Sequence, residues 1–206
     1  VTEPVGLRAP VGRFAHARAF VDASNRSVVG FNVDNLYSFA VLDLGDEPTV
    51  MSVPDKGERY WIMQVIDAWN GIPGAPGSRT RGGLGGDFLI AGPTWDGDLP
   101  DGMELIACPT RIAMIGGRTY CTGPDDYATV NALQDQYRLC PLSKWGTGYE
   151  PPAHTPVKEG VDADTLVNAP VLGLGTEAYF QRLNTLLGDN PAYPADADAL
   201  AALERL

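Results

Sequence analysis

The segment Arg59-Tyr-Trp-Ile-Met-Gln-Val-Ile-Asp-Ala-Trp69 decides the fold class of this 206-residue chain. Its side chains alternate between two faces. One face carries Tyr60, Ile62, Gln64 and Ile66, and the other carries Trp61, Met63, Val65, Asp67 and Trp69. Alternation with a period of two is typical of a strand, and apolar side chains on both faces favour a strand that is covered on both sides. We therefore predict a central strand over residues 59–69.

Further short strands lie on both sides of this segment. They are predicted over residues 36–44, 49–53, 87–91, 104–108 and 112–121, with Gly116-Gly117 as a bulge or bend in the last one. Helical spacing is found in a short stretch near residues 14–19, after Pro124, after Thr176 and after Ala197. Short strands separated by close turn signals favour a mainly β fold, a β-sandwich or jelly-roll-like domain, with a few peripheral and C-terminal helices.

The composition divides the chain into four parts. Residues 1–31 form a lead-in, 32–142 the β-sandwich domain, 143–172 a Pro- and Gly-rich connection, and 173–206 a C-terminal helical segment. The apolar stripe of the last segment still runs at Leu206, and a short isolated helix is marginal in water. We therefore expect a companion β domain or another subunit to cover it. The alternative is that the segment docks on the β domain.

Charge and composition exclude several classes of protein. The formal net charge is −11 without a cluster of Lys and Arg, which argues against nucleic-acid binding. No run reaches the roughly 18 apolar residues of a transmembrane helix. The histidines, His16 and His154, and the three cysteines lack the spacing of a zinc site, and no cofactor is predicted. The acidic run over residues 96–104 leaves calcium as an alternative, although it departs from the EF-hand pattern.

The cysteines have two interpretations. Cys108 and Cys121 flank a predicted hairpin, so a disulfide between them is one interpretation. The other, which we favour, is that they are buried apolar thiols. Cys140 remains without a partner under either interpretation.

Six motifs follow one another between residues 32 and 142. They are Asn32-Val-Asp34-Asn-Leu-Tyr37-Ser38, Asp67-Ala-Trp69-Asn70, Gly77-Ser-Arg79-Thr80, Gly92-Pro-Thr-Trp95-Asp-Gly-Asp-Leu99-Pro100, Gly117-Arg118-Thr119 and Ala132-Leu-Gln-Asp135 with Pro141-Leu142. Their order and spacing resemble the bacterial family catalogued as domain of unknown function 1254. The resemblance implies a domain that is usually followed by a second uncharacterised β-rich domain. It also favours an extracytoplasmic location, periplasmic or secreted, over a cytoplasmic one. It names no reaction.

Two carboxylates are the candidate catalytic residues. Asp67 shares a strand face with apolar side chains, so partial burial would raise its pKa, as at many active sites. Its alternative role is to cap the amides of the following loop. Asp34 lies in the first motif and is the second candidate. Ser38 is not a candidate nucleophile, because no histidine lies at a useful spacing from it.

Five residues are candidate ligand-binding residues. Arg79 lies in a loop rich in glycine, whose amides can cradle an anion together with a guanidinium. Arg118 lies inside a predicted strand, where it needs a carboxylate or a ligand. Asn32, Tyr37 and Trp69 would line the mouth and walls of the same pocket. The alternatives are a solvated Arg79, a structural ion pair at Arg118, and a turn at Asn32.

These residues lead to two hypotheses about function. The first is an extracytoplasmic domain that binds or hydrolyses an anionic or carbohydrate-like ligand, a small molecule or a glycan. If the protein is an enzyme, a hydrolase is the class that paired carboxylates favour. The second hypothesis is a structural or assembly module without catalytic activity. A third interpretation, a metal-dependent jelly-roll oxygenase, is disfavoured because it needs two histidines and a carboxylate on facing strands, and both histidines lie outside the predicted β block.

Overall fold

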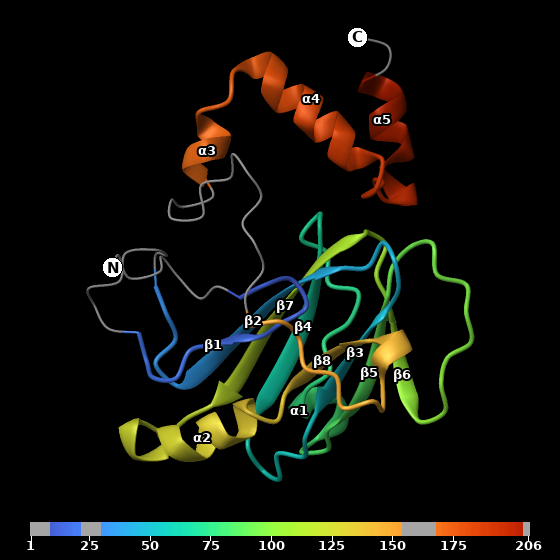
Figure 1. Cartoon of the computed structure of the whole chain (residues 1–206). Coiled ribbons are helices and arrows are strands. Elements are labelled where there is room, and N and C mark those ends of the chain that lie inside the picture. The colour runs from blue at the N-terminus through green and yellow to red at the C-terminus, as the bar shows by residue number, and fades with distance from the viewer. Residues whose placement is uncertain (1–8, 22–29, 154–167, 204–206) are drawn as a thin grey trace.

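The computed structural model describes residues 9–21, 30–153 and 168–203. Within these residues, two four-stranded sheets form the body of the fold (Figure 1). The first sheet has the order β1 (Ala15–His16), β2 (Asn35–Asp43), β7 (Ile112–Tyr120) and β4 (Trp61–Asp67). The second has the order β6 (Met103–Ala107), β5 (Gly86–Ala91), β3 (Thr49–Val53) and β8 (Arg138–Pro141). The β5–β6 pair is parallel, and the other neighbours are antiparallel.

The helices lie at the two ends of the sheets. They are α1 (Ser78–Arg81), α2 (Tyr127–Gln134), α3 (Asn168–Leu172), α4 (Thr176–Leu187) and α5 (Ala197–Leu203). In Figure 1, α2 lies at the lower end and α3, α4 and α5 lie beyond the upper end. The prediction of a mainly β fold with peripheral and C-terminal helices is confirmed. The two sheets remain open, and the jelly-roll pattern stays a prediction.

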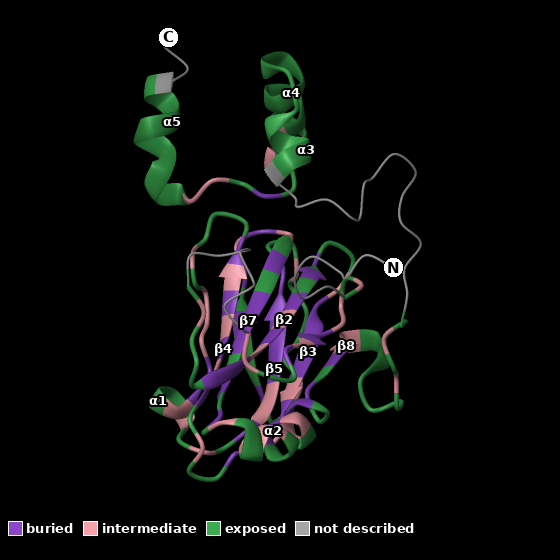
Figure 2. Cartoon of the chain, turned by 90° about the vertical axis from the view of Figure 1, so that its left-hand side faces the viewer, coloured by how far each residue is buried: buried purple, intermediate pink, exposed green. Residues whose placement is uncertain are grey.

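The main core lies between the two sheets. Alternate side chains of β2, β4 and β7 meet those of β3, β5 and β8 there, and Figure 2 shows stretches coloured as buried along the strands of both sheets. Trp61, Met63, Met51 and Phe88 are among its largest fully buried side chains. Burying a large apolar side chain contributes about 1.5–3 kcal/mol, so this layer supplies much of the driving force for folding.

The predicted central position of the 59–69 strand is wrong. β4 is an edge strand whose only sheet neighbour is β7 among the described strands. One face is buried, but Ile62, Gln64 and Ile66 on the other face are only half-buried. The free edge is covered by the following loop, because the Met63 and Val65 amides donate to the carbonyls of Pro76 and Gly74, each at 2.8 Å. Apolar periodicity reports burial and not the position of a strand in its sheet, so it could not reveal this.

Two local predictions near β2 also fail. The stretch near residues 14–19 contains β1 and not a helix, because Ala15 and His16 pair with Phe39 and Ser38 of β2. Gly116 and Gly117 form no bulge, since both pair in continuous register with β2 and β4. A Cβ atom at Gly117 would lie 2.6 Å from the Met63 sulfur. Close packing of strands explains this glycine.

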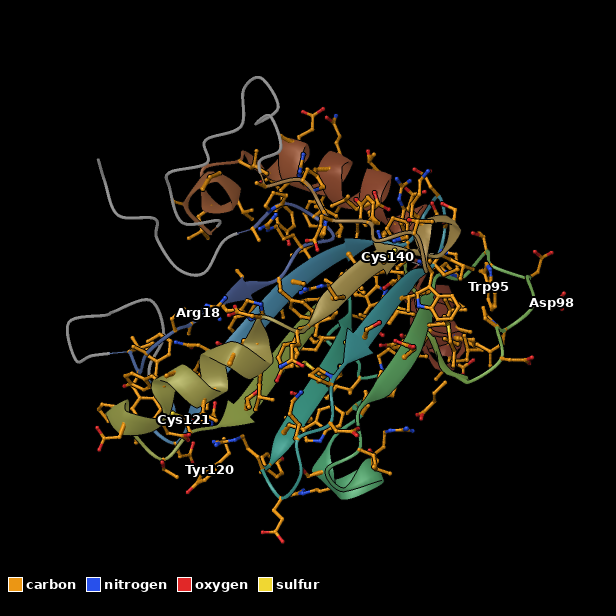
Figure 3. The ribbon with its side chains drawn as sticks, turned by 60° about the horizontal axis from the view of Figure 1, so that its bottom comes forward. Arg18, Trp95, Asp98, Tyr120, Cys121 and Cys140 are labelled. Atoms are coloured by element: carbon orange, nitrogen blue, oxygen red, sulfur yellow. The ribbon has the colours of Figure 1, made fainter. Side chains whose placement is uncertain are left out.

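All three cysteines lie in described parts of the chain, and all three are free. Cys108 and Cys121 are buried, which confirms the interpretation as apolar thiols and rules out the disulfide between them in this structure. Figure 3 shows Cys121 and Cys140 well apart, because Cys121 directly follows β7 whereas Cys140 lies on β8. No helix of the described residues is long and apolar enough to cross a membrane.

Candidate functional site

The predicted catalytic carboxylates lie far apart. Asp67 pairs with Ala113 near one end of β7, whereas Asp34 precedes β2, whose first residue Asn35 pairs with Tyr120 at the other end. Ala113 and Tyr120 are seven residue steps apart along β7, which is roughly 23 Å at about 3.3 Å per step. Asp34 is exposed, and its Oδ1 accepts a hydrogen bond of 2.6 Å from Asn35. The structure therefore does not bring the two carboxylates into one site.

The Asp67 carboxylate binds two segments of the chain: the loop that follows β4 and the C-terminal segment at Tyr193. Its side chain is buried, with 6% of the residue exposed. Oδ1 accepts hydrogen bonds from the amides of Trp69 and Gly71, each at 2.8 Å. Oδ2 accepts a hydrogen bond from the hydroxyl of Tyr193. The two bonds from loop amides are the contacts expected if Asp67 caps the following loop, which was the alternative interpretation. A catalytic role for Asp67 stays a prediction.

Three of the predicted ligand-binding residues do come together. The Asn32 amide donates to the Tyr37 hydroxyl at 3.0 Å, and the Arg118 guanidinium lies 5.8 Å from the centre of the Tyr37 ring. Tyr37 and Arg118 are cross-strand neighbours, and Tyr37 also stacks on Phe39. Arg118 is exposed, so it needs no buried partner. This cluster lies on the side of β2 and β7 that faces away from the core.

The last two predicted residues lie apart from this cluster. The Trp69 indole donates to the Pro191 carbonyl at 2.9 Å and so helps to hold the C-terminal segment. Arg79 lies on α1 and is exposed. None of the seven predicted residues lines the hollow described next.

We call this hollow the arginine hollow. It has a volume of about 260 Å³ and opens between β1, the end of α2, β8 and the chain near Pro151. Its described lining comprises the guanidinium residues Arg13, Arg18 and Arg138, the ring residues Phe14, His16 and Tyr137, the carboxylate residues Asp135 and Glu150, and Gln134, Leu139 and Pro151. Figure 3 shows Arg18 beside α2. Three basic side chains from two distant segments of the sequence, residues 13–18 and residue 138, therefore meet here.

The arginine hollow is locally positive in an acidic protein. Arg18 pairs with Asp135 at 2.6 Å, and Arg138 lies 3.8 Å from Glu150. Arg13 instead donates to the Pro151 carbonyl at 2.9 Å and pairs with no carboxylate among the described residues. Three guanidinium groups thus face two carboxylates in the described lining, against a formal charge of −11 for the whole chain. A local excess of positive charge attracts anions.

His16 is the titratable group at the centre of the hollow. Its Nδ1 lies 2.8 Å from the hydroxyl of Ser38, and its ring stacks on Phe14 with 5.5 Å between ring centres. Burial, followed by the nearby Arg18, lowers the pKa of His16 to about 4, and Asp135 opposes this shift. The imidazole is therefore neutral at pH 7.

Gln134 holds His16, β1 and β2 together. It is fully buried, and its Nε2 lies 3.2 Å from the Ala17 carbonyl, 3.1 Å from the Tyr37 carbonyl and 3.3 Å from the Ser38 hydroxyl. A buried amide with several partners has one preferred orientation. The floor of the hollow is therefore fixed by a side chain at the end of α2.

Tyr137 separates the hollow from a buried lysine. Its hydroxyl lies 2.6 Å from Thr119 in the core, and burial raises the pKa of Tyr137 to about 12. The amine of Lys56 lies 4.3 Å from the centre of the Tyr137 ring and donates to the Pro54 carbonyl at 2.9 Å. Burial lowers the pKa of Lys56 to about 7. A buried amine that is only partly charged at neutral pH thus lies on the other side of the Tyr137 ring from the hollow.

The sequence contained weak signals for this site. Arg13, His16 and Arg18 lie close together in the lead-in, but no pattern connected them to the β block. Gln134 belongs to one of the quoted motifs, and a polar residue between the apolar Val130 and Tyr137 of a helical stripe could have marked it. His16 and Ser38 are 22 residues apart, and only strand pairing makes them neighbours.

Metal ligands do not gather anywhere in the described ranges. No group of three or more His, Cys, Asp or Glu residues there could hold a metal ion. The acidic run over residues 96–104 was the basis for the alternative of calcium binding. Asp96, Asp98 and Asp101 in this run are exposed, and Figure 3 shows Asp98 on an outlying loop. Calcium binding has no support from the geometry of these residues.

Comparison with known proteins gives a family but no reaction. A family model described as "Protein of unknown function (DUF1254)" matches residues 11–141. A search of curated proteins found no match. A crystal structure of the VPA0106 protein from Vibrio parahaemolyticus is similar, with a TM-score of 0.68 and 25% sequence identity over 93% of this chain and 42% of that chain. The chain thus spans less than half the length of that protein. It belongs to the DUF1254 family, as its motifs indicated.

Proposed function

We propose that this domain binds a small molecule that carries a carboxylate or phosphate group, and that the arginine hollow is its binding site. The observation that carries the proposal is the convergence of Arg13, Arg18 and Arg138 around a neutral His16. Guanidinium groups bind carboxylate and phosphate oxygens through two parallel N–H donors. Arg13 has its charge available for such a ligand, since it pairs with no carboxylate among the described residues.

The size and walls of the hollow define the class of ligand further. Ligand pockets usually measure about 300–1,000 Å³, so a hollow of about 260 Å³ fits a small ligand. Phe14 and Leu139 add apolar surface beside the charged groups. A short organic acid or a small phosphate ester suits this combination. An extracytoplasmic location is part of the proposal and is supported by the family resemblance.

Replacing Arg13 with glutamine should weaken anion binding about tenfold, because one charge-assisted contact contributes about 1.5–3 kcal/mol. The probes are succinate and inorganic phosphate, titrated separately into the full chain and followed by NMR amide shifts near the hollow. Arg79→Gln is the matched control, since it removes the same charge from an exposed helix outside the hollow. Binding that is lost in Arg79→Gln and kept in Arg13→Gln would instead support the site predicted from the sequence.

A second function, assembly with a partner, is favoured by the C-terminal helices. The segment between α4 and α5 is fixed to the sheets: the Ile112 amide donates to the Asn190 side chain at 3.0 Å, and Arg111 lies 3.2 Å from Asp189. The helices themselves are mostly exposed, as Figure 2 shows, and Phe180 is 55% exposed and Leu172 81% exposed. An anchored segment with exposed apolar helices is typical of a surface that binds another protein or domain.

The assembly proposal predicts self-association that depends on these helices. We expect light scattering after size-exclusion chromatography to show dimers or larger species of the full chain, and Phe180→Ser with Leu172→Ser to shift the distribution toward monomer. Both side chains are exposed, so the folded β domain should keep its melting temperature. A monodisperse monomer at every concentration would count against self-assembly.

A further inference from the structure

We propose that Ser38 and Gln134 hold His16 in the tautomer that carries its proton on Nε2, so that the neutral imidazole donates a hydrogen bond to the bound oxyanion. The inference rests on the proposed function, because it assigns a role to one residue of the arginine hollow. It assigns His16 to binding and not to general-base catalysis. Ser38 and Gln134 are positioning residues that act through His16.

The hydroxyl of Ser38 determines which ring nitrogen carries the proton. Ser38 is fully buried, and a buried O–H group almost always donates a hydrogen bond to a nearby acceptor. Among the described residues its hydrogen-bond neighbours are His16 Nδ1 at 2.8 Å and Gln134 Nε2 at 3.3 Å. The amide nitrogen of Gln134 is only a donor. The Ser38 hydroxyl can therefore donate only to Nδ1, which must then be unprotonated.

The orientation of Gln134 supports the same assignment. Its Oε1 accepts a hydrogen bond from Arg18 at 3.4 Å, and its Nε2 lies near the carbonyls of Ala17 and Tyr37. Reversing the amide would place its oxygen against these two carbonyls and its NH₂ group against the Arg18 guanidinium. Both changes are unfavourable, so Gln134 presents N–H groups toward Ser38.

Two consequences follow for the ligand. Nδ1 is taken by Ser38, so Nε2 is the ring nitrogen that remains for a molecule in the hollow. A protonated Nε2 has no lone pair with which to remove a proton from water, so His16 in this state cannot act as a general base. It can donate an N–H to an oxyanion that the guanidinium groups of Arg13 and Arg18 also bind. A receptor site fits this arrangement better than a hydrolytic site.

NMR of the ligand-free chain tests the tautomer directly. Long-range proton–nitrogen correlation spectra distinguish a protonated from an unprotonated ring nitrogen, and His16→Gln assigns the signals because His154 is the only other histidine. We expect an unprotonated Nδ1 and a protonated Nε2 at neutral pH. Ser38→Ala should move the spectrum toward a mixture of tautomers. A wild-type spectrum with the proton on Nδ1 would overturn the proposal, even if Ser38→Ala failed to fold.

Binding by three variants tests the donor role. A glutamine side chain places its amide nitrogen about where Nε2 lies, whereas asparagine places it near Nδ1. With succinate and inorganic phosphate as separate probes, we expect His16→Gln to bind within about threefold of wild type. His16→Ala and His16→Asn should bind about tenfold more weakly, as befits the loss of one hydrogen bond to a charged group. Equal losses in all three variants would disprove the donor role.

The two proposals fail in different ways. If the wild-type chain binds neither probe, the proposed function and the donor role both fail, while the ligand-free spectrum still decides the tautomer. If it binds a probe but His16→Gln does not, the site stands and the donor role is wrong. A preference for succinate over phosphate, or the reverse, identifies which oxyanion the hollow accepts.

Discussion

Replacing Asp67 with alanine is expected to lower the free energy of unfolding by about 3 kcal/mol. The buried carboxylate accepts hydrogen bonds from two amides and from the Tyr193 hydroxyl. Its removal leaves three partly buried donors without this acceptor; a fully buried donor without an acceptor costs about 1–3 kcal/mol, and partial exposure to water lowers that cost for each of the three. The same change removes one of the contacts that hold the C-terminal segment, the hydrogen bond from the Tyr193 hydroxyl. Chemical denaturation followed by tryptophan fluorescence measures the loss.

Asp34→Ala is the matched control for this measurement. Asp34 is exposed, and surface substitutions usually change stability by less than about 0.5 kcal/mol. A stability difference between the two variants would show that the two carboxylates predicted as a catalytic pair have different roles. If Asp67→Ala instead left stability unchanged or raised it, the loop-cap role would be wrong and the catalytic prediction would regain support.

Replacing Lys56 with methionine is expected to raise the free energy of unfolding by about 1–3 kcal/mol near neutral pH. The residue is only 7% exposed, and its amine has one carbonyl acceptor and the ring faces of Tyr137 and Trp61 but no carboxylate in contact among the described residues. Methionine fills a similar volume without a charge. The gain is smaller than the full pKa shift implies, because methionine loses the hydrogen bond to the Pro54 carbonyl and the contacts of the charged amine with the two rings.

The pH dependence gives this prediction its sign. Burial lowers the pKa of Lys56 from 10.5 to about 7 in the folded protein. Between these values the unfolded chain binds more protons, so the wild-type protein gains stability from Lys56 as the pH rises from about 7 toward 10.5. Below a pH of about 7 that stability is absent. The advantage of Lys56→Met should therefore be largest near neutral pH and shrink at alkaline pH.

Lys144→Met serves as the control, because Lys144 is exposed. Denaturation curves at about pH 7 and about pH 9.5 should differ for Lys56→Met relative to wild type and not for Lys144→Met. A destabilising effect of Lys56→Met at both values would mean that its contacts with the aromatic rings outweigh the cost of burying its charge. Reduced succinate or phosphate binding by a stabilised Lys56→Met would connect this amine to the arginine hollow, from which Tyr137 separates it.

The site was harder to predict than the fold because its parts are distant in sequence. Asn32, Tyr37 and Arg118 did come together. Residues 32 and 37 belong to one local motif, and the pairing of β2 with β7 places Arg118 beside Tyr37. Asp67 and Asp34 looked alike as acidic residues beside apolar strands. Their surroundings differ only because the Tyr193 hydroxyl and two loop amides reach one of them.

The sequence by itself determined the mainly β class, the approximate positions of β2 to β7 and the family, because period-two alternation and ordered motifs are local properties of the chain. It did not reveal the short strands β1 and β8. Only the tertiary structure decided that β4 is an edge strand and that Arg13, His16, Gln134 and Arg138 share a hollow. The physical reason is that local alternation encodes which side chains are buried, whereas hydrogen bonds between distant segments decide which buried and charged groups become neighbours. The pairing of β1 with β2 is the clearest case, because it places His16 beside Ser38.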